Sequence, residues 1–262
     1  MDDSYMDPEE PQKRGFPMKW IAIIALVPLL FFVVKTPDYF SKPAREYRAI
    51  LKEFGAKEKA FYGRYRDAKT NEEKQAIAKA HSGPAQYVGR MYALAQAFPR
   101  SKWGFEALKW SVGRAGYLPE TEKAIKLLAD KYTTDSGIDI SLIGSLEHVK
   151  SDTAAQLLDG IIKDHSSAQI CGYAMVVKGK RRLNAKDESG EDILEQAAEK
   201  YGDIMLRTKT VGQVARGELH ERRNLGIGKM SPEIEGEDID GVKFKLSDYR
   251  GKVVVIDFWG DW

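Results

Sequence analysis

The sequence predicts a mainly α-helical chain, in which one transmembrane helix precedes a set of helical hairpins. These are followed by the opening hairpin and first buried strand of an incomplete α/β fold. Three observations predict this order. Residues 20–34 carry no charged side chain, and apolar residues then recur at helical spacing as far as about residue 224. After Leu225 that spacing gives way to closely spaced turn residues and a β-branched run. The 41 Lys and Arg nearly balance 39 Asp and Glu, so no global charge indicates a nucleic-acid partner.

The N-terminus is interpreted as an acidic tail, residues 1–18, followed by a membrane anchor, residues 19–35. The uncharged residues 20–34 would span about 22 Å as a helix, which is short of a hydrocarbon core of roughly 30 Å. The lysines at both ends of the anchor can extend to the interface. A cleaved signal peptide is the alternative, but the next stretch, KTPDYFSKPA, has no small-x-small cleavage site. We expect an uncleaved anchor in membrane lipid, whose orientation the flanking charges do not determine.

Residues 36–225 are predicted to form a helical domain, because several segments place apolar residues on one helical face. Each such face needs a partner helix to cover it. The clearest sets are Ile125, Leu128, Ala129 and Tyr132; Ala154, Leu157, Leu158, Ile161 and Ile162; and Leu194, Ala197, Ala198, Tyr201 and Met205.

Capping residues and helix breakers mark the ends of these helices. Thr70 with Glu73 is predicted to form a capping box, and Ser151 precedes another apolar face. Breaks are expected at Pro99, Pro119 and Gly137. The segment YALAQAFPRSKWGFEALKWSV faintly resembles a tetratricopeptide-type (TPR-like) hairpin, but the chain has no clean repeat period.

The helical domain offers few candidates for chemistry. Cys171, the one cysteine, lies in an apolar run and is expected to be a buried small hydrophobe. The four histidines are far apart in sequence and lack neighbouring ligands, so we expect no metal site. The basic run at residues 177–186 is interpreted as a solvated helix end, with phosphate or anionic lipid as the alternative ligand.

The C-terminal segment, residues 226–262, has the pattern of strands and tight turns. Asp240-Gly241 between two alternating stretches predicts a hairpin with a tight primed turn. Ser247 and Asp248 can cap a short helical turn that ends at Gly251. The continuous apolar run from Val253 to Phe258 is typical of a strand buried on both faces.

The segment SPEIEGEDIDGVKFKLSDYRGKVVVIDFWGDW resembles the opening of the redoxin domain of membrane-anchored, thioredoxin-like oxidoreductases of the TlpA type, which are related to the AhpC/TSA antioxidant group. The pieces that carry the resemblance are SP, the DG hairpin, LSDYRGK and DFWGDW, and they cover about 35 residues. The resemblance implies a Cys-Gly-Pro-Cys motif directly after Trp262, where one thiolate attacks a substrate disulfide and a second thiol resolves the mixed disulfide. No cofactor is implied, and the partners are a protein disulfide substrate and an electron-donor protein.

Two residues of this sequence match supporting positions of that family. Asp257 corresponds to the buried strand acid, for which the resemblance implies proton transfer with the resolving thiol. Flanking apolar residues would favour its neutral form. Trp262 corresponds to the aromatic residue that shields the active-site turn. The alternatives are an acid at a solvent-facing strand end and an ordinary half-buried aromatic.

The chain ends before the expected thiols, so the resemblance implies that these 262 residues alone lack exchange activity. A UGA codon for selenocysteine read as a stop would end the chain at this place, and so would a break in the sequence record. The alternatives to the oxidoreductase are a membrane-anchored helical interaction or scaffold protein and a peroxide-reducing redoxin. By the same resemblance, the helical and redoxin regions are expected outside the cytoplasmic membrane, with a single span and a cytoplasmic tail.

Overall fold

The structure, a computed structural model, describes residues 38–257. The predicted acidic tail and the predicted anchor at residues 19–35 lie outside the described residues, as does Trp262. Within the described part of the chain, no helix is both long enough and apolar enough to cross a membrane.

The described chain is mainly helical, as predicted, and a small hairpin follows the helices. The α-helices are α2 (Lys42–Asp67), α3 (Asn71–Ala80), α4 (Ala85–Ala97), α5 (Lys102–Ala115), α6 (Glu122–Lys131), α7 (Ile140–Ser145), α8 (Asp152–Asp164), α9 (Ala168–Asn184), α10 (Ser189–Lys200) and α11 (Val211–Asn224). The short elements are the 3₁₀ helices η1 (Pro119–Thr121) and η2 (Leu246–Tyr249) and the strands β1 (Glu235–Glu237) and β2 (Lys243–Lys245).

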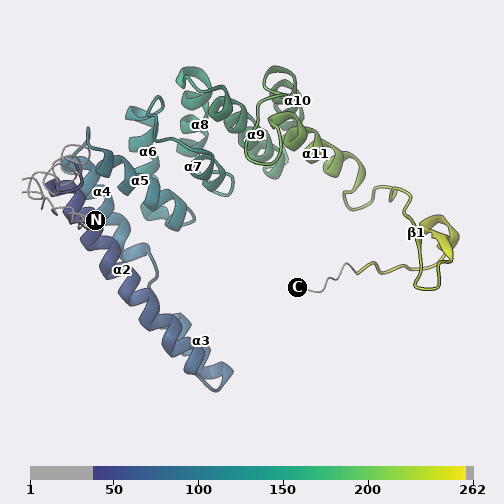
Figure 1. Cartoon of the computed structure of the whole chain (residues 1–262), viewed down its shortest axis with the longest axis horizontal. Coiled ribbons are helices and arrows are strands. Elements are labelled where there is room, and N and C mark those ends of the chain that lie inside the picture. The colour runs from purple at the N-terminus through teal and green to yellow at the C-terminus, as the bar shows by residue number, and fades with distance from the viewer. Residues whose placement is uncertain (1–37, 258–262) are drawn as a thin grey trace, which may run out of the picture.

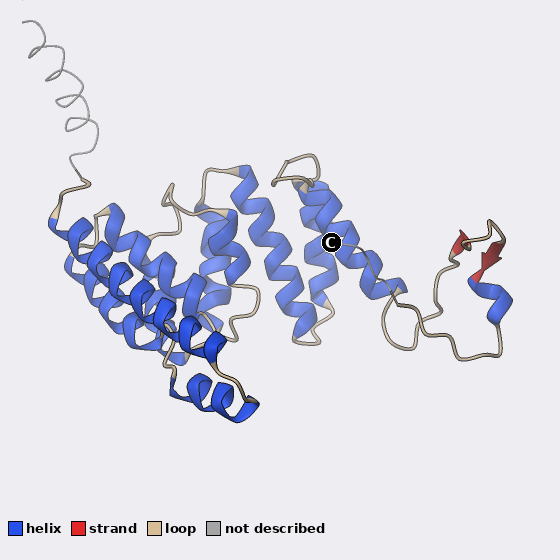
Figure 2. Ribbon diagram, turned by 60° about the horizontal axis from the view of Figure 1, so that its bottom comes forward, coloured by secondary structure: helices blue, strands red, loops and turns tan. Residues whose placement is uncertain are grey.

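The helices lie side by side in two layers (Figures 1 and 2). In the first, here layer A, α5 packs on α2 and α7, and α9 packs on α7 and α11. The second, layer B, contains α4, α6, α8 and α10, where α6 packs on α8 while α4 and α10 pack on α5 and α9 of layer A. α3 packs on α2 and contributes no buried residue. The helical-hairpin prediction is confirmed, and the unequal helix lengths agree with the lack of a clean repeat in the sequence.

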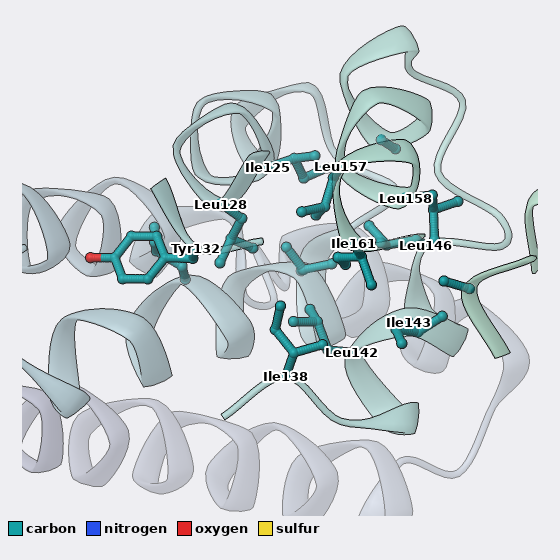
Figure 3. Packing of buried hydrophobic residues seen from close by; sticks show 14 of the residues in the cluster. Ile125, Leu128, Tyr132, Ile138, Leu142, Ile143, Leu146, Leu157, Leu158 and Ile161 are labelled. Atoms are coloured by element: carbon teal, nitrogen blue, oxygen red, sulfur yellow. The ribbon is translucent and has the colours of Figure 1, made fainter. Parts of the chain in front are cut away.

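Buried side chains fill the space between the layers in three clusters. The largest lies among α5 to α9 and is shown in Figure 3. The second joins α9, α10 and α11, and the third joins α2, α4 and α5. Ile125, Leu128, Leu157 and Leu158 are at most 1% exposed, and burying one such side chain contributes about 1.5–3 kcal/mol. The apolar faces predicted for these two helices are therefore confirmed as core.

Several predicted helix ends are also confirmed. The Thr70 hydroxyl accepts the Glu73 N–H at 3.2 Å while the Glu73 carboxylate accepts the Thr70 N–H, which completes the capping box. The Ser151 side chain accepts the Ala154 N–H at 3.2 Å, and Pro119 begins η1.

One predicted helix ends earlier than its apolar spacing indicates. α10 stops at Lys200, and Met205 is 51% exposed and forms an isolated antiparallel bridge with Thr210. The chain leaves the helix through Tyr201 and Gly202, where a Cβ on Gly202 would come within 2.3 Å of the Ala198 carbonyl oxygen. Hydrogen bonds across this loop replace the last expected helical turn.

Candidate functional site

The predicted hairpin is present in the C-terminal segment. β1 and β2 are antiparallel, with Glu235 opposite Lys245 and Glu237 opposite Lys243. The ring of Phe244 lies over Gly236, where an added Cβ would approach the ring to 3.1 Å. Figure 1 shows this hairpin apart from the helices, at the end of the chain that follows α11.

The hairpin turn differs from the tight primed turn that the sequence predicts. Among its non-glycine residues none has a positive φ, and Gly241 alone has φ +77°. The Asp238 carboxylate accepts the N–H groups of Asp240 and Val242, each at 2.9 Å, and the Asp238 carbonyl accepts the Gly241 N–H at 3.0 Å. The Asp238 side chain therefore stabilises a three-residue loop with glycine in the left-handed region, which is the next most common hairpin connection.

The predicted capped turn after β2 is confirmed as η2. The Asp248 carboxylate accepts the Lys245 N–H at 2.9 Å, and Gly251 follows with φ +79°. Glu233 ties the start of the segment to this turn, because its carboxylate accepts the Ser247 N–H at 2.9 Å. Hydrogen bonding to Ser247 lowers the pKa of Glu233.

The buried strand predicted from Val253 onward is not formed in the described chain. Residues 253–257 have no assigned secondary structure, and Val253 and Val255 are 97% and 88% exposed. The reason is that no neighbouring strand among the described residues pairs with this run, so its backbone groups and apolar side chains face solvent. Asp257 is likewise exposed rather than held in a buried strand, and Trp262 lies outside the described residues.

The single cysteine is buried, as predicted. Cys171 is 4% exposed on α9, and its Sγ lies 3.1 Å from the His165 carbonyl oxygen. Burial raises the pKa of the thiol. A thiol that is both covered and held neutral is a poor nucleophile, so Cys171 does not offer a site for disulfide exchange.

The other polar candidates of the helical region are engaged in local contacts. Within residues 38–257 no group of histidine, cysteine or acidic side chains could hold a metal ion. In the basic run, Lys180 lies 2.8 Å from Glu147 and Arg182 lies 2.6 Å from Asp187. Arg181 donates to three backbone carbonyls, those of Leu146, Val149 and Ser151. The solvated helix end that the sequence predicts is therefore present only from residue 184 onward. Residues 177–183 include buried positions, and Arg181 binds backbone carbonyls of the preceding loop.

Two hollows with both polar and apolar lining residues arise from segments that sequence spacing does not connect. One hollow, of about 710 Å³, lies between α8 and α9 beside residues 147–152. A second, of about 440 Å³, lies on layer A and joins Ser141, Tyr173 and the loop of Arg207 and Lys209. No motif marks either hollow, because packing brings separate segments together. Residues 147–159 meet residues 178–185 in the larger hollow, and residues 140–144 meet Tyr173 and residues 206–214 in the smaller one.

Comparison with known proteins finds partial relatives. The chain is 36% identical over 60 residues to the thiol-disulfide oxidoreductase ResA of Bacillus cereus, which is 22% of this chain and 35% of that protein. The ResA protein of Geobacillus thermodenitrificans is 38% identical over 42 residues, 16% of this chain and 24% of that protein. ResA of Bacillus anthracis is 36% identical over 60 residues, again 22% and 35% of the two chains.

These matches support a thioredoxin-like redox family. The aligned part spans about a third or less of the length of the curated relatives it matches. No protein-family description matches the chain, and no solved structure matches it.

Proposed function

We propose that residues 226–262 are the N-terminal part of a thioredoxin-like domain and that the protein acts in thiol–disulfide exchange. The observation that carries the proposal is the 36–40% identity to proteins named thiol-disulfide oxidoreductase. The hairpin β1–β2 and the turn η2 support it, because the residues that carry the family resemblance fold into the elements expected of them.

The exposed apolar residues of this segment also support the proposal. Val253, Val255 and Ile239 are 97%, 88% and 103% exposed, and Val242 is 60% exposed. Several apolar side chains at this exposure within one short segment are typical of a surface that another part of a domain or a partner covers. Further strands of a thioredoxin-like sheet would cover it and would pair with residues 253–257.

The reactive groups are proposed to belong to a part of the domain that these 262 residues do not include. Exchange needs an attacking thiolate and a resolving thiol, whereas the chain has one cysteine, buried in α9. The 262 residues alone are therefore proposed to be inactive. In a complete domain, a cysteine at the start of the next helix would have its thiolate stabilised by unpaired N–H groups and the helix dipole.

The test begins with the gene and ends with an assay. We expect the codons after that of Trp262 to encode, in frame, a cysteine or selenocysteine followed by Gly-Pro-Cys. The gene product with these residues should reduce a protein disulfide, and replacing the first reactive residue with serine should abolish the reduction. An unrelated reading frame, or activity that survives the serine variant, would contradict the proposal. Reduction of peroxide in place of a protein disulfide would favour the peroxide-reducing alternative.

We also propose that residues 20–34 tether the protein to the cytoplasmic membrane, with the helices and the redox domain outside the cytoplasm. The uncharged run supports this proposal, and relatives of the TlpA type function where protein disulfides are formed. We expect the protein to float with the membrane fraction and to stay there after carbonate extraction. Protease added to spheroplasts should digest the helical region. Release by carbonate, or full protection from protease, would contradict the anchor or the orientation.

A second candidate function is a helical interaction protein without redox activity. It is favoured by one observation, which is that the helices have three buried clusters of their own and contain no accessible thiol. It would be preferred if the complete gene product bound a partner but reduced neither a protein disulfide nor a peroxide.

A further inference from the structure

Layer A carries a hollow whose polar side chains form no hydrogen bond or ion pair in the described chain. Its floor consists of the half-buried Ile140, Tyr173, Leu206 and Val214, which come from α7, α9, α11 and the loop before α11. Its rim carries the exposed cations Arg207 and Lys209. Among the described residues, neither cation forms an ion pair or a side-chain hydrogen bond, and no acidic side chain lines the hollow.

The loop that presents these cations is built to hold one conformation. Met205 and Thr210 form an antiparallel bridge, and the Leu206 N–H donates to the Lys209 carbonyl at 3.0 Å. From α9, the Gln169 amide donates to the carbonyls of Met205 at 2.6 Å and Leu206 at 3.1 Å. Two cations on a rigid loop lose little backbone freedom when an anion binds, so binding is less opposed by entropy than it would be on a mobile loop.

Hydroxyl groups complete the polar rim. Tyr173, Ser141 and Thr208 line the hollow, and in the described chain their hydroxyl groups donate to no protein acceptor. Burial raises the pKa of Tyr173, so its hydroxyl keeps its proton at neutral pH and can donate to a carboxylate. Gly144 leaves this hydroxyl accessible, since a Cβ there would lie 3.3 Å from the Tyr173 oxygen.

The hollow continues along layer A toward the N-terminal helices. A second hollow of about 290 Å³ shares Ser141 with it and is lined by Trp110, Gly113 and Arg114 of α5. Glu106 also lines this second hollow. An acidic group is therefore favoured beside Arg207 and Lys209. An apolar or aromatic group can pack on Trp110 in the second hollow, whose lining also includes Lys109 and Arg114.

The larger hollow between α8 and α9 differs in that three of its four lysine and arginine side chains already have partners, while Lys150 forms no ion pair among the described residues. Lys178 lies 2.7 Å from Asp159, Arg182 lies 2.6 Å from Asp187, and Arg181 donates to backbone carbonyls. An anion that bound there would have to compete with these contacts. In the layer A hollow, no acidic side chain among the described residues pairs with Arg207 or Lys209, so an anion would not have to displace one.

We propose that the α5–α7–α9 face of layer A docks an extended acidic segment of a partner protein, whose carboxylates bind Arg207 and Lys209 while apolar residues cover the floor. Charge complementarity favours this ligand, because unpaired cations and hydroxyl donors bind carboxylates. The apolar floor favours a peptide with apolar residues over a small anion. The docking does not depend on thiol exchange, so binding and redox assays can fail separately.

The test uses the full chain in detergent micelles and a library of short random peptides displayed on phage. We expect the selected peptides to be enriched in Asp and Glu next to apolar residues. Each peptide is then synthesised with a fluorescent label and titrated by anisotropy. The double variant Arg207→Gln and Lys209→Gln should weaken binding about tenfold.

A matched control removes the same charge elsewhere. Lys123 and Lys163 are exposed cations of α6 and α8 in layer B, with no ion pair among the described residues, and their replacement by Gln should change binding less than about twofold. A second variant, Gly113→Met, places a side chain over the groove, where the nearest side-chain atom is 3.8 Å from the added Cβ. It should also weaken binding without unfolding α5.

Three outcomes would overturn the proposal. The first is that the selected peptides are not acidic. The second is that the two double Gln variants weaken peptide binding equally. The third is that millimolar free glutamate displaces the peptide completely. The last result would mean that a carboxylate alone occupies the hollow and that no peptide segment is recognised.

Discussion

Gly179 and Gly190 meet where α9 crosses α10, so closely that a Cβ on Gly190 would lie 2.5 Å from the Gly179 carbonyl oxygen. A Cβ on Gly179 would in turn lie 2.8 Å from Leu194 Cγ and 3.0 Å from the Gly190 carbonyl oxygen. The two helices can approach this closely only because neither residue carries a side chain. This contact holds the N-terminal end of α10 against α9 of layer A.

Replacement of Gly190 by alanine is expected to destabilise the helical region by about 1–3 kcal/mol, because backbone atoms must move to admit the methyl group. Gly113→Ala is the matched control. It lies in α5 with only Ser145 Oγ near the added Cβ, at 3.8 Å, and should stabilise by up to about 1 kcal/mol through helix propensity. Urea unfolding followed by circular dichroism measures both. Equal effects of the two variants would contradict the close crossing.

The paired faces of these helices were predictable, but the partner of each face was not. The spacing of Leu157 and Leu158 predicts that they are buried, and the position of Ser151 predicts a helix cap, because apolar spacing and capping residues are local features of the sequence. The meeting of Gly179 with Gly190, and the grouping of Tyr173 with Arg207, depend on how helices pack. Val253 read as buried from its neighbours, yet burial also needs adjacent strands, and the described chain provides none for it.

Arg181→Met is expected to cost about 1–3 kcal/mol, since the carbonyls of Leu146, Val149 and Ser151 would lose their shared donor. Methionine keeps much of the aliphatic stem, so the loss reports mainly on the hydrogen bonds. Arg216→Met on α11 is the control, as Arg216 is exposed and should change the free energy of unfolding by less than about 0.5 kcal/mol. If Arg181→Met cost no more than Arg216→Met, Arg181 would stabilise the fold through the packing of its aliphatic stem and not through these hydrogen bonds.

Asp187 is expected to make stability depend on pH in a narrow acid range. Hydrogen bonds from Ser189, together with Arg182, lower its pKa to about 2 from 3.8. Because the folded pKa is the lower one, the stabilisation is complete above pH 3.8 and is lost as the pH falls through about 2. Asp187→Asn should therefore be less stable than the wild type at pH 7, and the difference should shrink below pH 3.8.

NMR titration of the Asp187 carboxyl carbon gives a direct check, with an expected midpoint of about 2. A midpoint near the model-peptide value, or a stability difference that does not change with pH, would contradict the role of the two hydrogen-bonded partners.

Asp238→Ala is expected to loosen the hairpin turn without affecting the helices. Its carboxylate accepts two N–H groups, those of Asp240 and Val242, and each such bond contributes about 0.5–1.5 kcal/mol. Hydrogen exchange at the Asp240 and Val242 amides should therefore become faster. Ile239→Ala in the same turn is the control, because Ile239 is fully exposed. Unchanged exchange in Asp238→Ala would show that Gly241 alone determines the turn.

Cys171 is expected to remain unreactive in the native protein. Its Sγ lies within 3.1 Å of the His165 carbonyl oxygen, it is 4% exposed, and burial raises its pKa. At pH 8 the thiolate fraction is therefore smaller than that of a free cysteine, and the reagent has little access. Ellman's reagent should label the native chain far more slowly than it labels glutathione, and should label one thiol once the chain is unfolded in guanidinium.

The same property separates Cys171 from the proposed redox chemistry. Cys171→Ala should leave the disulfide reductase activity of the longer gene product unchanged, because exchange needs an accessible thiolate that this position does not supply. Loss of activity in Cys171→Ala, with the fold intact by circular dichroism, would instead mean that the helical region contributes a thiol to the reaction. Rapid labelling of the native chain would point the same way, since it requires α9 to open around the sulfur.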